Sequence, residues 1–237
     1  MPSLVAGGCT IEPLGDRVLL LQLGVAIDPT LNARVHALVA ALRVAALAGV
    51  DDIVPAFSSL ALHYDPAAWQ GPPAPWRRFA AAVADVLEHA ADRVPPAGSC
   101  VELPVCYGGL HGPDLEAVAR HARLSPEEVV RRHAAPTYRV AMIGFAPGFP
   151  YLLGLDPALA TPRRHTPRTR VPAGSVGIGG AQAGIYPSVL PGGWQLVGCT
   201  PLRLFDPARE PACLLAAGDA VRFRPVDAPA FDKAEPA

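Results

Sequence analysis

GFAPGFPY, residues 144–151, opens a region in which proline or glycine recurs every few positions until about residue 211. Each proline fixes its own φ angle and lacks a backbone donor, so this spacing excludes long helices. The apolar runs between the turns are short, at residues 138–145, 175–178, 195–197 and 220–223. Short strands joined by Pro- and Gly-rich turns predict a β-barrel or sandwich here.

The residues before this region show alternating strand and helix signals. Residues 18–23, VLLLQL, form a short apolar run typical of a buried strand. Asp28 suits the N-cap and Pro29 the first position of a helix. Its apolar stripe runs from Leu31 to Ala46, and Gly49 is expected to end it.

A second strand and helix follow, at residues 53–64 and 76–90. Two helices on one small sheet predict an α+β layer. The sequence VPPAG at residues 94–98 is the expected domain boundary. We therefore expect three parts: an α+β N-terminal domain (residues 1–96), a β-barrel domain (97–228) and a disordered tail (229–237).

Two short helices are expected early in the second domain. Asp114 suits the cap of a helix that runs through Arg120. SPEE at residues 125–128 is a capping box with proline at the first helical position, and its helix is expected to end near His133. His133 then has two possible roles: an acid or base near neutral pH, or a capping or core residue.

Composition excludes several classes of function. A net charge of -1 gives no field that would attract nucleic acid, and no apolar run is long enough for a membrane span. The start lacks the basic segment of a signal peptide, so a cytoplasmic protein is expected. The five cysteines include no C-x-x-C pair and the seven histidines no metal pattern, so buried or idle thiols and no metal are expected. Lys233 is the only lysine, which excludes a Walker-type lysine in a folded site.

A second Pro-rich stretch, PRRHTPRTRVPAGSV at residues 162–176, holds four arginines and a histidine within eight residues. Guanidinium groups bind carboxylate or phosphate through two hydrogen bonds, so this stretch is either an anion site or a solvated surface. The following residues Gly174 and Ser175 offer backbone amides that can stabilise an oxyanion. Ser175 is not in a G-x-S-x-G motif, which argues against a serine nucleophile.

The other two stretches leave similar alternatives open. The aromatic residues of GFAPGFPY form either the wall of a ligand pocket or a plug at one end of the barrel. The third stretch, YPSVLPGGWQL at residues 186–196, places a Gly-Gly turn before Trp194. That turn indicates either a hairpin with a buried anchor or a close approach of backbone to ligand.

Taken in order, these motifs resemble one protein family, whose members are variously called the B-type subunit of 5-oxoprolinase, allophanate hydrolase subunit 1 and sporulation-kinase inhibitor. The resemblance covers more than half of the chain. Besides the three stretches it includes PVCYGG (104–109), GPDL (112–115), SPEE (125–128), TPLRLFDP (200–207) and GD (218–219). Two positions depart from the family pattern: Leu190 stands where a serine is usual, and Cys199 where an arginine is usual.

The resemblance implies a cyclophilin-like β-barrel after the α/β N-terminal domain. It also implies companion subunits: a second cyclophilin-like barrel subunit and a lactam-utilisation subunit. By motif position, the catalytic candidates are His133, Arg168 and Ser175. The substrate-binding candidates are Phe149, Gly174, Gln182, Tyr186, Gly192, Gly193 and Trp194.

The implied function is that of one non-autonomous subunit of an ATP-dependent 5-oxoprolinase, which hydrolyses 5-oxoproline to glutamate. ATP would be the cosubstrate of the complex, bound by an unassigned subunit. Two alternatives stay open: a protein-binding inhibitor of a sensor histidine kinase, and a subunit of an allophanate hydrolase or urea carboxyltransferase system. The chain lacks a Met-Lys attachment motif, so it is not itself a biotin carrier.

Overall fold

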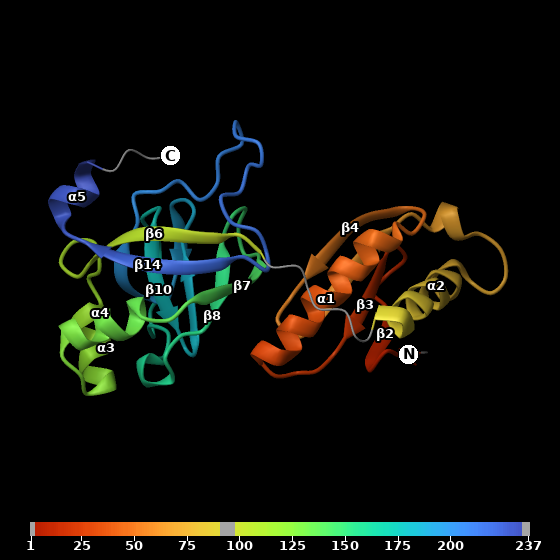
Figure 1. Cartoon of the computed structure of the whole chain (residues 1–237), viewed down its shortest axis with the longest axis horizontal. Helices are drawn as coiled ribbons and strands as arrows, with labels where there is room; N and C mark the ends of the chain where they lie inside the picture. Colours follow the sequence, from red (N-terminus) through yellow and green to blue (C-terminus); the bar gives the residue numbers. More distant parts are fainter. Residues whose placement is uncertain (1–2, 91–97, 234–237) are drawn as a thin grey trace. The chain divides into compact units, whose positions relative to one another are not determined.

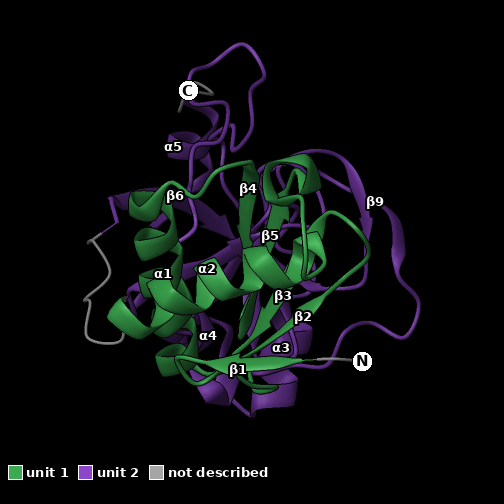
Figure 2. Ribbon diagram, turned by 90° about the vertical axis from the view of Figure 1, so that its right-hand side faces the viewer, with its two compact units in different colours: residues 1–97 green, residues 98–237 purple. Residues whose placement is uncertain are grey.

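A computed structural model describes residues 3–90 and 98–233. The chain divides into two compact units, residues 1–97 and 98–237 (Figure 2). The expected boundary sequence, residues 94–98, lies outside the described residues except for Gly98. Each unit has its own apolar core, and each is described by itself below.

Unit 1 is an α+β layer. Its five-stranded antiparallel sheet has the order β1-β2-β3-β5-β4. Helices α1 and α2 lie across one face of this sheet (Figure 2). The elements are β1 (Leu4–Ala6), β2 (Cys9–Pro13), β3 (Val18–Gln22), α1 (Pro29–Ala45), β4 (Val50–Pro55), β5 (Ser59–Tyr64), the 3-10 helix η1 (Pro66–Trp69) and α2 (Pro75–Ala90).

The start of α1 follows the sequence prediction, and its end does not. The Asp28 carboxylate accepts a hydrogen bond from the Leu31 amide at 2.9 Å, as an N-cap does. The helix stops at Ala45 with Ala46 in the left-handed conformation (φ 46°), three residues before the expected Gly49. Gly49 is also left-handed (φ 70°) and lies in a close contact, because a Cβ atom there would lie 2.7 Å from the Ala68 Cβ atom.

Unit 2 is a closed seven-stranded barrel of order β10-β11-β8-β7-β14-β6-β13 (Figure 1). Neighbouring strands are antiparallel except for the parallel pair β6 and β14. This confirms the predicted fold class. The elements are β6 (Cys100–Tyr107), α3 (Leu115–Ala122), α4 (Pro126–Ala134), β7 (Tyr138–Ile143), β8 (Pro150–Leu153), η2 (Pro157–Leu159), β9 (Arg168–Val171), β10 (Ser175–Gly179), β11 (Gln182–Ile185), β12 (Leu190–Gly192), β13 (Gln195–Cys199), β14 (Ala220–Val226) and α5 (Ala228–Lys233).

Helix α5 occupies the described part of the disordered tail expected at residues 229–237, of which residues 234–237 lie outside the described residues. Residues 228–233 are helical, and the Phe231 ring lies 4.3 Å from the His111 ring. The Asp227 side chain accepts a hydrogen bond from the Ala230 amide at 2.9 Å, which caps this turn. The polar, Pro- and Ala-containing sequence of this end predicted disorder. It does not indicate that Phe231 packs against His111.

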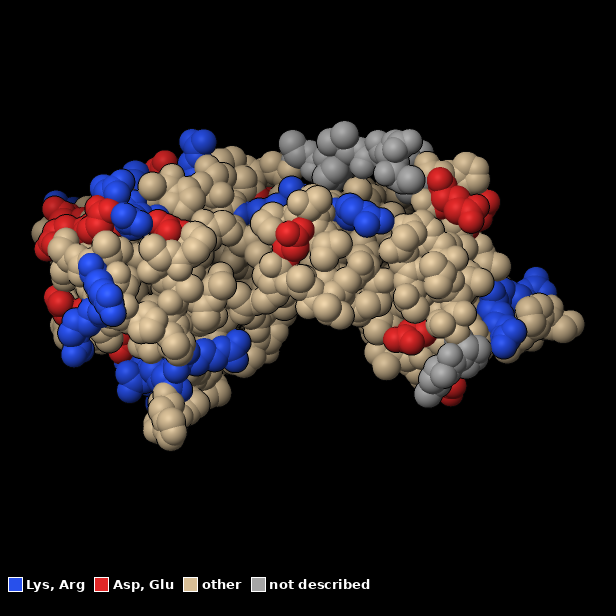
Figure 3. All heavy atoms as spheres, turned by 90° about the horizontal axis from the view of Figure 1, so that it is seen from below, with Lys and Arg blue, Asp and Glu red and all other residues tan. Residues whose placement is uncertain are grey.

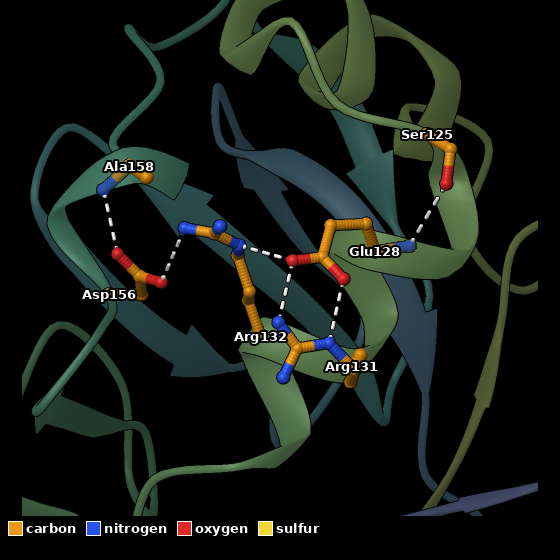
Figure 4. Close-up of polar contacts among 6 residues, drawn as sticks. All are labelled: Ser125, Glu128, Arg131, Arg132, Asp156 and Ala158. Carbon is orange, nitrogen blue, oxygen red and sulfur yellow. Dashed lines mark hydrogen bonds and ion pairs between the residues drawn. The ribbon is translucent and has the colours of Figure 1, made fainter.

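The capping box of α4 is only half formed (Figure 4). The Ser125 hydroxyl accepts from the Glu128 amide at 3.2 Å. The Glu128 carboxylate turns to Arg131 (2.6 Å) and Arg132 (2.7 Å). Arg132 also reaches Asp156 at 3.3 Å, which links α4 to the start of η2.

A hollow of about 430 Å³ lies beside this network. Its lining is Arg131, Arg132, Ala135, Pro136, Gly154 and Asp156. Both arginines already pair with carboxylates of this chain, so the hollow carries little surplus charge. Basic and acidic side chains also lie next to each other over unit 2 in Figure 3 (left). Within residues 3–90 and 98–233, no helix combines the length and apolar character of a membrane span.

Candidate functional site

A buried carboxylate organises the arginine-rich stretch. Asp114, only 5% exposed, accepts hydrogen bonds on Oδ1 from Arg168 at 2.8 Å and from Arg164 at 3.2 Å. Its Oδ2 atom accepts from the Leu196 amide at 2.7 Å. The Asp114 side chain makes no capping bond to α3, although it occupies the expected N-cap position. It instead fixes the start of α3, the arginine stretch and β13 to one another.

The arginines carry more charge than Asp114 neutralises. Two guanidinium groups share one carboxylate, and a third, Arg163, lies 5.7 Å above the Trp194 ring. The Nη1 atom of Arg168 is buried and has no hydrogen-bond partner among the described residues. A buried donor without a partner costs roughly 1–3 kcal/mol. The arrangement therefore favours an additional anionic acceptor beside Arg168.

The three Pro- and Gly-rich stretches meet in an aromatic cluster. Phe149 precedes β8, Tyr186 follows β11 and Trp194 precedes β13, and all three are at most 5% exposed. The Phe149 ring lies nearly perpendicular to Tyr186, at 5.2 Å, and to Trp194, at 5.7 Å. Such edge-to-face contacts are a favourable geometry for aromatic rings. Arg163 joins this cluster to the arginine stretch through Trp194.

Glycines next to the aromatic rings leave room that a side chain would fill. A Cβ atom on Gly192 would lie 2.2 Å from the Tyr186 hydroxyl oxygen, and one on Gly179 would lie 2.5 Å from the Trp194 ring. The Gly193 carbonyl accepts from the Arg164 amide at 2.6 Å, which ties the Gly-Gly turn to the arginine stretch. Trp194 is thus a buried anchor, but the turn is not a hairpin, because β12 pairs with β9 and β13 with β10 and β6.

The amides of Gly174 and Ser175 are used within the fold. Gly174 has φ 79°, and its amide donates to the Tyr186 carbonyl at 2.7 Å. The Ser175 amide points to the Pro172 carbonyl at 3.4 Å, and Ser175 itself is 3% exposed. The expected oxyanion donors are thus occupied. These residues support Tyr186 and the end of the arginine stretch.

His133 lies in the barrel core, apart from the aromatic cluster. Its Nδ1 atom is 2.9 Å from the Tyr107 hydroxyl, and its ring stacks on Phe223 at 4.8 Å. Burial lowers the pKa of His133 to about 3, because the charged imidazolium is poorly solvated there. Of the two roles left open by the sequence, this placement favours the core role.

Gln182 and Leu190 border the aromatic cluster. Gln182 begins β11, is half-buried, and pairs with Gly179, the residue that contacts Trp194. Leu190, which stands where the family pattern usually has serine, packs against the aromatic cluster. Sequence reasoning missed the role of Asp114, because its two arginine partners follow it 50 and 54 positions later. No local pattern reveals a pair at that separation.

Comparison with known proteins places the chain in a family. Residues 9–215 match the family model described as carboxyltransferase domain, subdomain C and D. A protein of Bacillus subtilis (strain 168), named as the B-type subunit of 5-oxoprolinase, is 45% identical over 221 residues, which cover 90% of this chain and 91% of that protein. A protein of the same name from Escherichia coli O157:H7 is 57% identical over 130 residues, 55% of this chain and 60% of its own.

Solved structures show the same fold. The structure of TTHA0988 has a TM-score of 0.76 and 39% identity, and it matches 90% of this chain and 40% of its own. This chain therefore spans about two fifths of that protein. PH0987 from Pyrococcus horikoshii, described as a conserved uncharacterized protein, has a TM-score of 0.56 and 40% identity. The match covers 93% of this chain and 99% of that protein.

The urea amidolyase of K. lactis has a TM-score of 0.73 over 98% of this chain and 16% of its own, at 19% identity. That identity shows a shared fold alone. The near-full-length similarity to the Bacillus subtilis protein goes further, because it covers both units of the chain. The chain belongs to the family of carboxyltransferase-domain proteins, subdomains C and D, in which the B-type subunits of 5-oxoprolinase are its relatives.

Proposed function

We propose that this chain is the B-type subunit of an ATP-dependent 5-oxoprolinase, a cytoplasmic complex that hydrolyses 5-oxoproline to glutamate. The observation that carries the proposal is the 45% identity over 90% of the chain to a protein of that name. The arginine and aromatic site supports it, because 5-oxoproline is a small ring that bears a carboxylate.

The reaction involves negatively charged groups, which the positive charge of the arginine stretch can stabilise. A lactam is a poor electrophile, and phosphorylation of its carbonyl oxygen by ATP makes it a better one. Water then opens the ring, a second water releases phosphate, and the products are glutamate, ADP and phosphate. Arg168 is the proposed contact of this chain to the substrate carboxylate or to the developing phosphate charge, through its unpaired Nη1 atom. Phe149 and Trp194 form the proposed wall of the site.

The remaining candidates have supporting roles in this proposal. Gly174, Ser175, Gln182, Gly192 and Gly193 hold the aromatic rings and the arginine stretch in place. The low pKa and burial of His133 suit it poorly for moving protons at neutral pH. We therefore assign proton transfer and ATP binding to the companion subunits. These are a second cyclophilin-like barrel subunit and a lactam-utilisation subunit.

Reconstitution tests the proposal. The chain is co-expressed with those two companions from the same genome, and 5-oxoproline-dependent release of phosphate from ATP is measured. We expect turnover by the complex, and none by the purified chain or by the complex without it. Full activity of the companions alone would overturn the assignment, as would turnover by this chain alone.

A further inference from the structure

Two cysteines face each other across neighbouring strands of the barrel. The antiparallel register of β6 and β13 pairs Cys106 directly with Cys199, and Tyr107 with Gly198. Residues directly opposite in an antiparallel pair have Cα atoms about 4.5–5.5 Å apart. A disulfide joins Cα atoms about 4.4–6.8 Å apart, so the backbone of this pair already suits one.

The two side chains lie on the same side of the sheet. Gly198 faces the core, since a Cβ atom there would lie 2.6 Å from the Val105 side chain. Successive residues of a strand point to opposite faces, so Cys199 and its partner Cys106 both point away from the barrel core. Both are free thiols: Cys106 is 6% exposed, and Cys199 is half-buried.

The Cys199 thiol also touches the segment that carries two site candidates. Its Sγ atom lies 3.6 Å from the Ala173 carbonyl, and the Gly174 carbonyl accepts from the Thr200 amide at 2.9 Å. A Cβ atom on Gly174 would lie 3.1 Å from this sulfur. The Cys199 sulfur therefore packs directly against Ala173 and Gly174, the two residues before Ser175.

We propose that Cys106 and Cys199 form a reversible disulfide that alters the packing under Gly174. A small disulfide such as glutathione disulfide is the oxidant. The more accessible Cys199 thiolate attacks one glutathione sulfur, and the first glutathione leaves and takes up a proton. The Cys106 thiolate then attacks Cys199 in the mixed disulfide and releases the second glutathione. Two cysteine sulfurs are oxidised, and one glutathione disulfide is reduced to two thiols.

The surroundings of the pair set its rate. Burial raises the pKa of Cys199 to about 11, and burial together with Asp227 and Asp232 raises the pKa of Cys106. Neither thiol is strongly nucleophilic at neutral pH, so the reaction is slow. Cys199 reacts with Cys106 rather than with another cysteine because the strand register places these two residues opposite each other. Cys100 provides a matched control: it lies on the same strand β6, is exposed, and pairs with Ala220.

The test is a peptide map of the purified chain, digested without reduction after incubation with excess glutathione disulfide. We expect a linked Cys106–Cys199 peptide, lighter than its two parts by two hydrogen atoms and lost on treatment with dithiothreitol. Cys199→Ser should abolish it, and Cys100→Ser should leave it unchanged. Amide hydrogen exchange at Gly174 should change on oxidation of the wild type and not of Cys199→Ser.

The wild-type map decides the proposal even if a variant fails to fold. The proposal is wrong if Cys106 and Cys199 are recovered as free thiols, or as separate glutathione adducts, under conditions that modify Cys100. Unchanged exchange at Gly174 in a fully cross-linked chain would overturn the link to that turn. Both readouts are independent of oxoprolinase activity.

Discussion

At the scale of single residues, Asp114 shows how a buried charge fixes a site. Its carboxylate accepts three hydrogen bonds, two from arginines and one from the Leu196 amide. Removing such an acceptor leaves buried donors without partners, which costs more than the bonds themselves contribute. Asp114 is therefore a positioning residue for Arg168, as well as a contributor to stability.

We predict that Asp114→Ala lowers the free energy of unfolding by about 2–3 kcal/mol, because charged hydrogen bonds are lost and the Leu196 amide is left buried. Urea denaturation of the purified chain measures this. The control is Asp51→Ala, whose carboxylate is 57% exposed and pairs with Arg17 on the surface. That variant should lose about 0.5 kcal/mol or less. Equal losses in both variants would contradict the role assigned to Asp114.

Phe145 has an unusual backbone conformation. The Ala146 amide donates to the Gly144 carbonyl at 2.7 Å, which closes a γ-turn with Phe145 at φ 67°. Turns of this hand are rare and strained for any residue with a Cβ atom. The Phe145 ring is 60% exposed and contacts Phe149 edge-on at 5.3 Å.

This strain predicts that Phe145→Gly is more stable than Phe145→Ala by about 1 kcal/mol, since glycine alone adopts positive φ without cost. Thermal or urea melting of the two variants measures the difference. Val44 is the matched control, because it is 72% exposed within the helix α1. There the order should reverse, with alanine more stable than glycine by about 1 kcal/mol. The same order at both positions would rule out strain at Phe145.

At the scale of elements, local signals predicted more than distant pairings did. The N-caps at Asp28 and Ser125 were predicted because each involves residues three positions apart. Closure of the barrel depends on the parallel pairing of β6 with β14, in which Cys100 meets Ala220. Strands β1 and β2 were missed, because each is short and the Gly7-Gly8 turn between them gives only a weak signal.

Among the elements, α4 has a pH-dependent contribution to stability. Hydrogen bonds from Arg131 and Arg132 lower the pKa of Glu128 from its usual 4.5 to about 2. A depressed carboxyl pKa stabilises the folded state at pH values above the unfolded pKa. That contribution falls as the pH drops from about 4.5 toward 2, where Glu128 becomes protonated in the folded protein as well.

The prediction concerns Glu128→Gln compared with the wild type. Its free energy of unfolding should be lower than that of the wild type at neutral pH, and the gap should shrink as the pH falls toward 2. Urea titrations at several pH values, followed by circular dichroism, measure it. Glu116→Gln on α3 serves as control, because that carboxylate makes none of these arginine contacts. A gap that is independent of pH would show that the arginine contacts do not hold the Glu128 charge.

At the scale of the whole molecule, the barrel unit brings together stretches that the sequence keeps apart. Phe149, Arg163 and Trp194 come from three separate stretches and meet in one aromatic cluster. The three motifs were recognisable in the sequence, whereas the link that Asp114 makes between the second and the third stretch was not. The core placement of His133 was one of two alternatives from the sequence; it shares the buried face of α4 with Val129, four positions earlier.

The kinetics of an Arg168→Ala variant in the reconstituted complex test whether Arg168 binds an anionic group of the substrates. Arg170→Ala is the control, two positions along the same strand and exposed to solvent. A charge-assisted contact contributes roughly 1.5–3 kcal/mol, so we expect the KM for 5-oxoproline, or for ATP, to rise about ten- to hundredfold in Arg168→Ala. Arg168→Lys should recover little of this loss, because an ammonium group lacks the planar fork. Unchanged KM values in Arg168→Ala, or equal effects in Arg170→Ala, would contradict the proposed anion site.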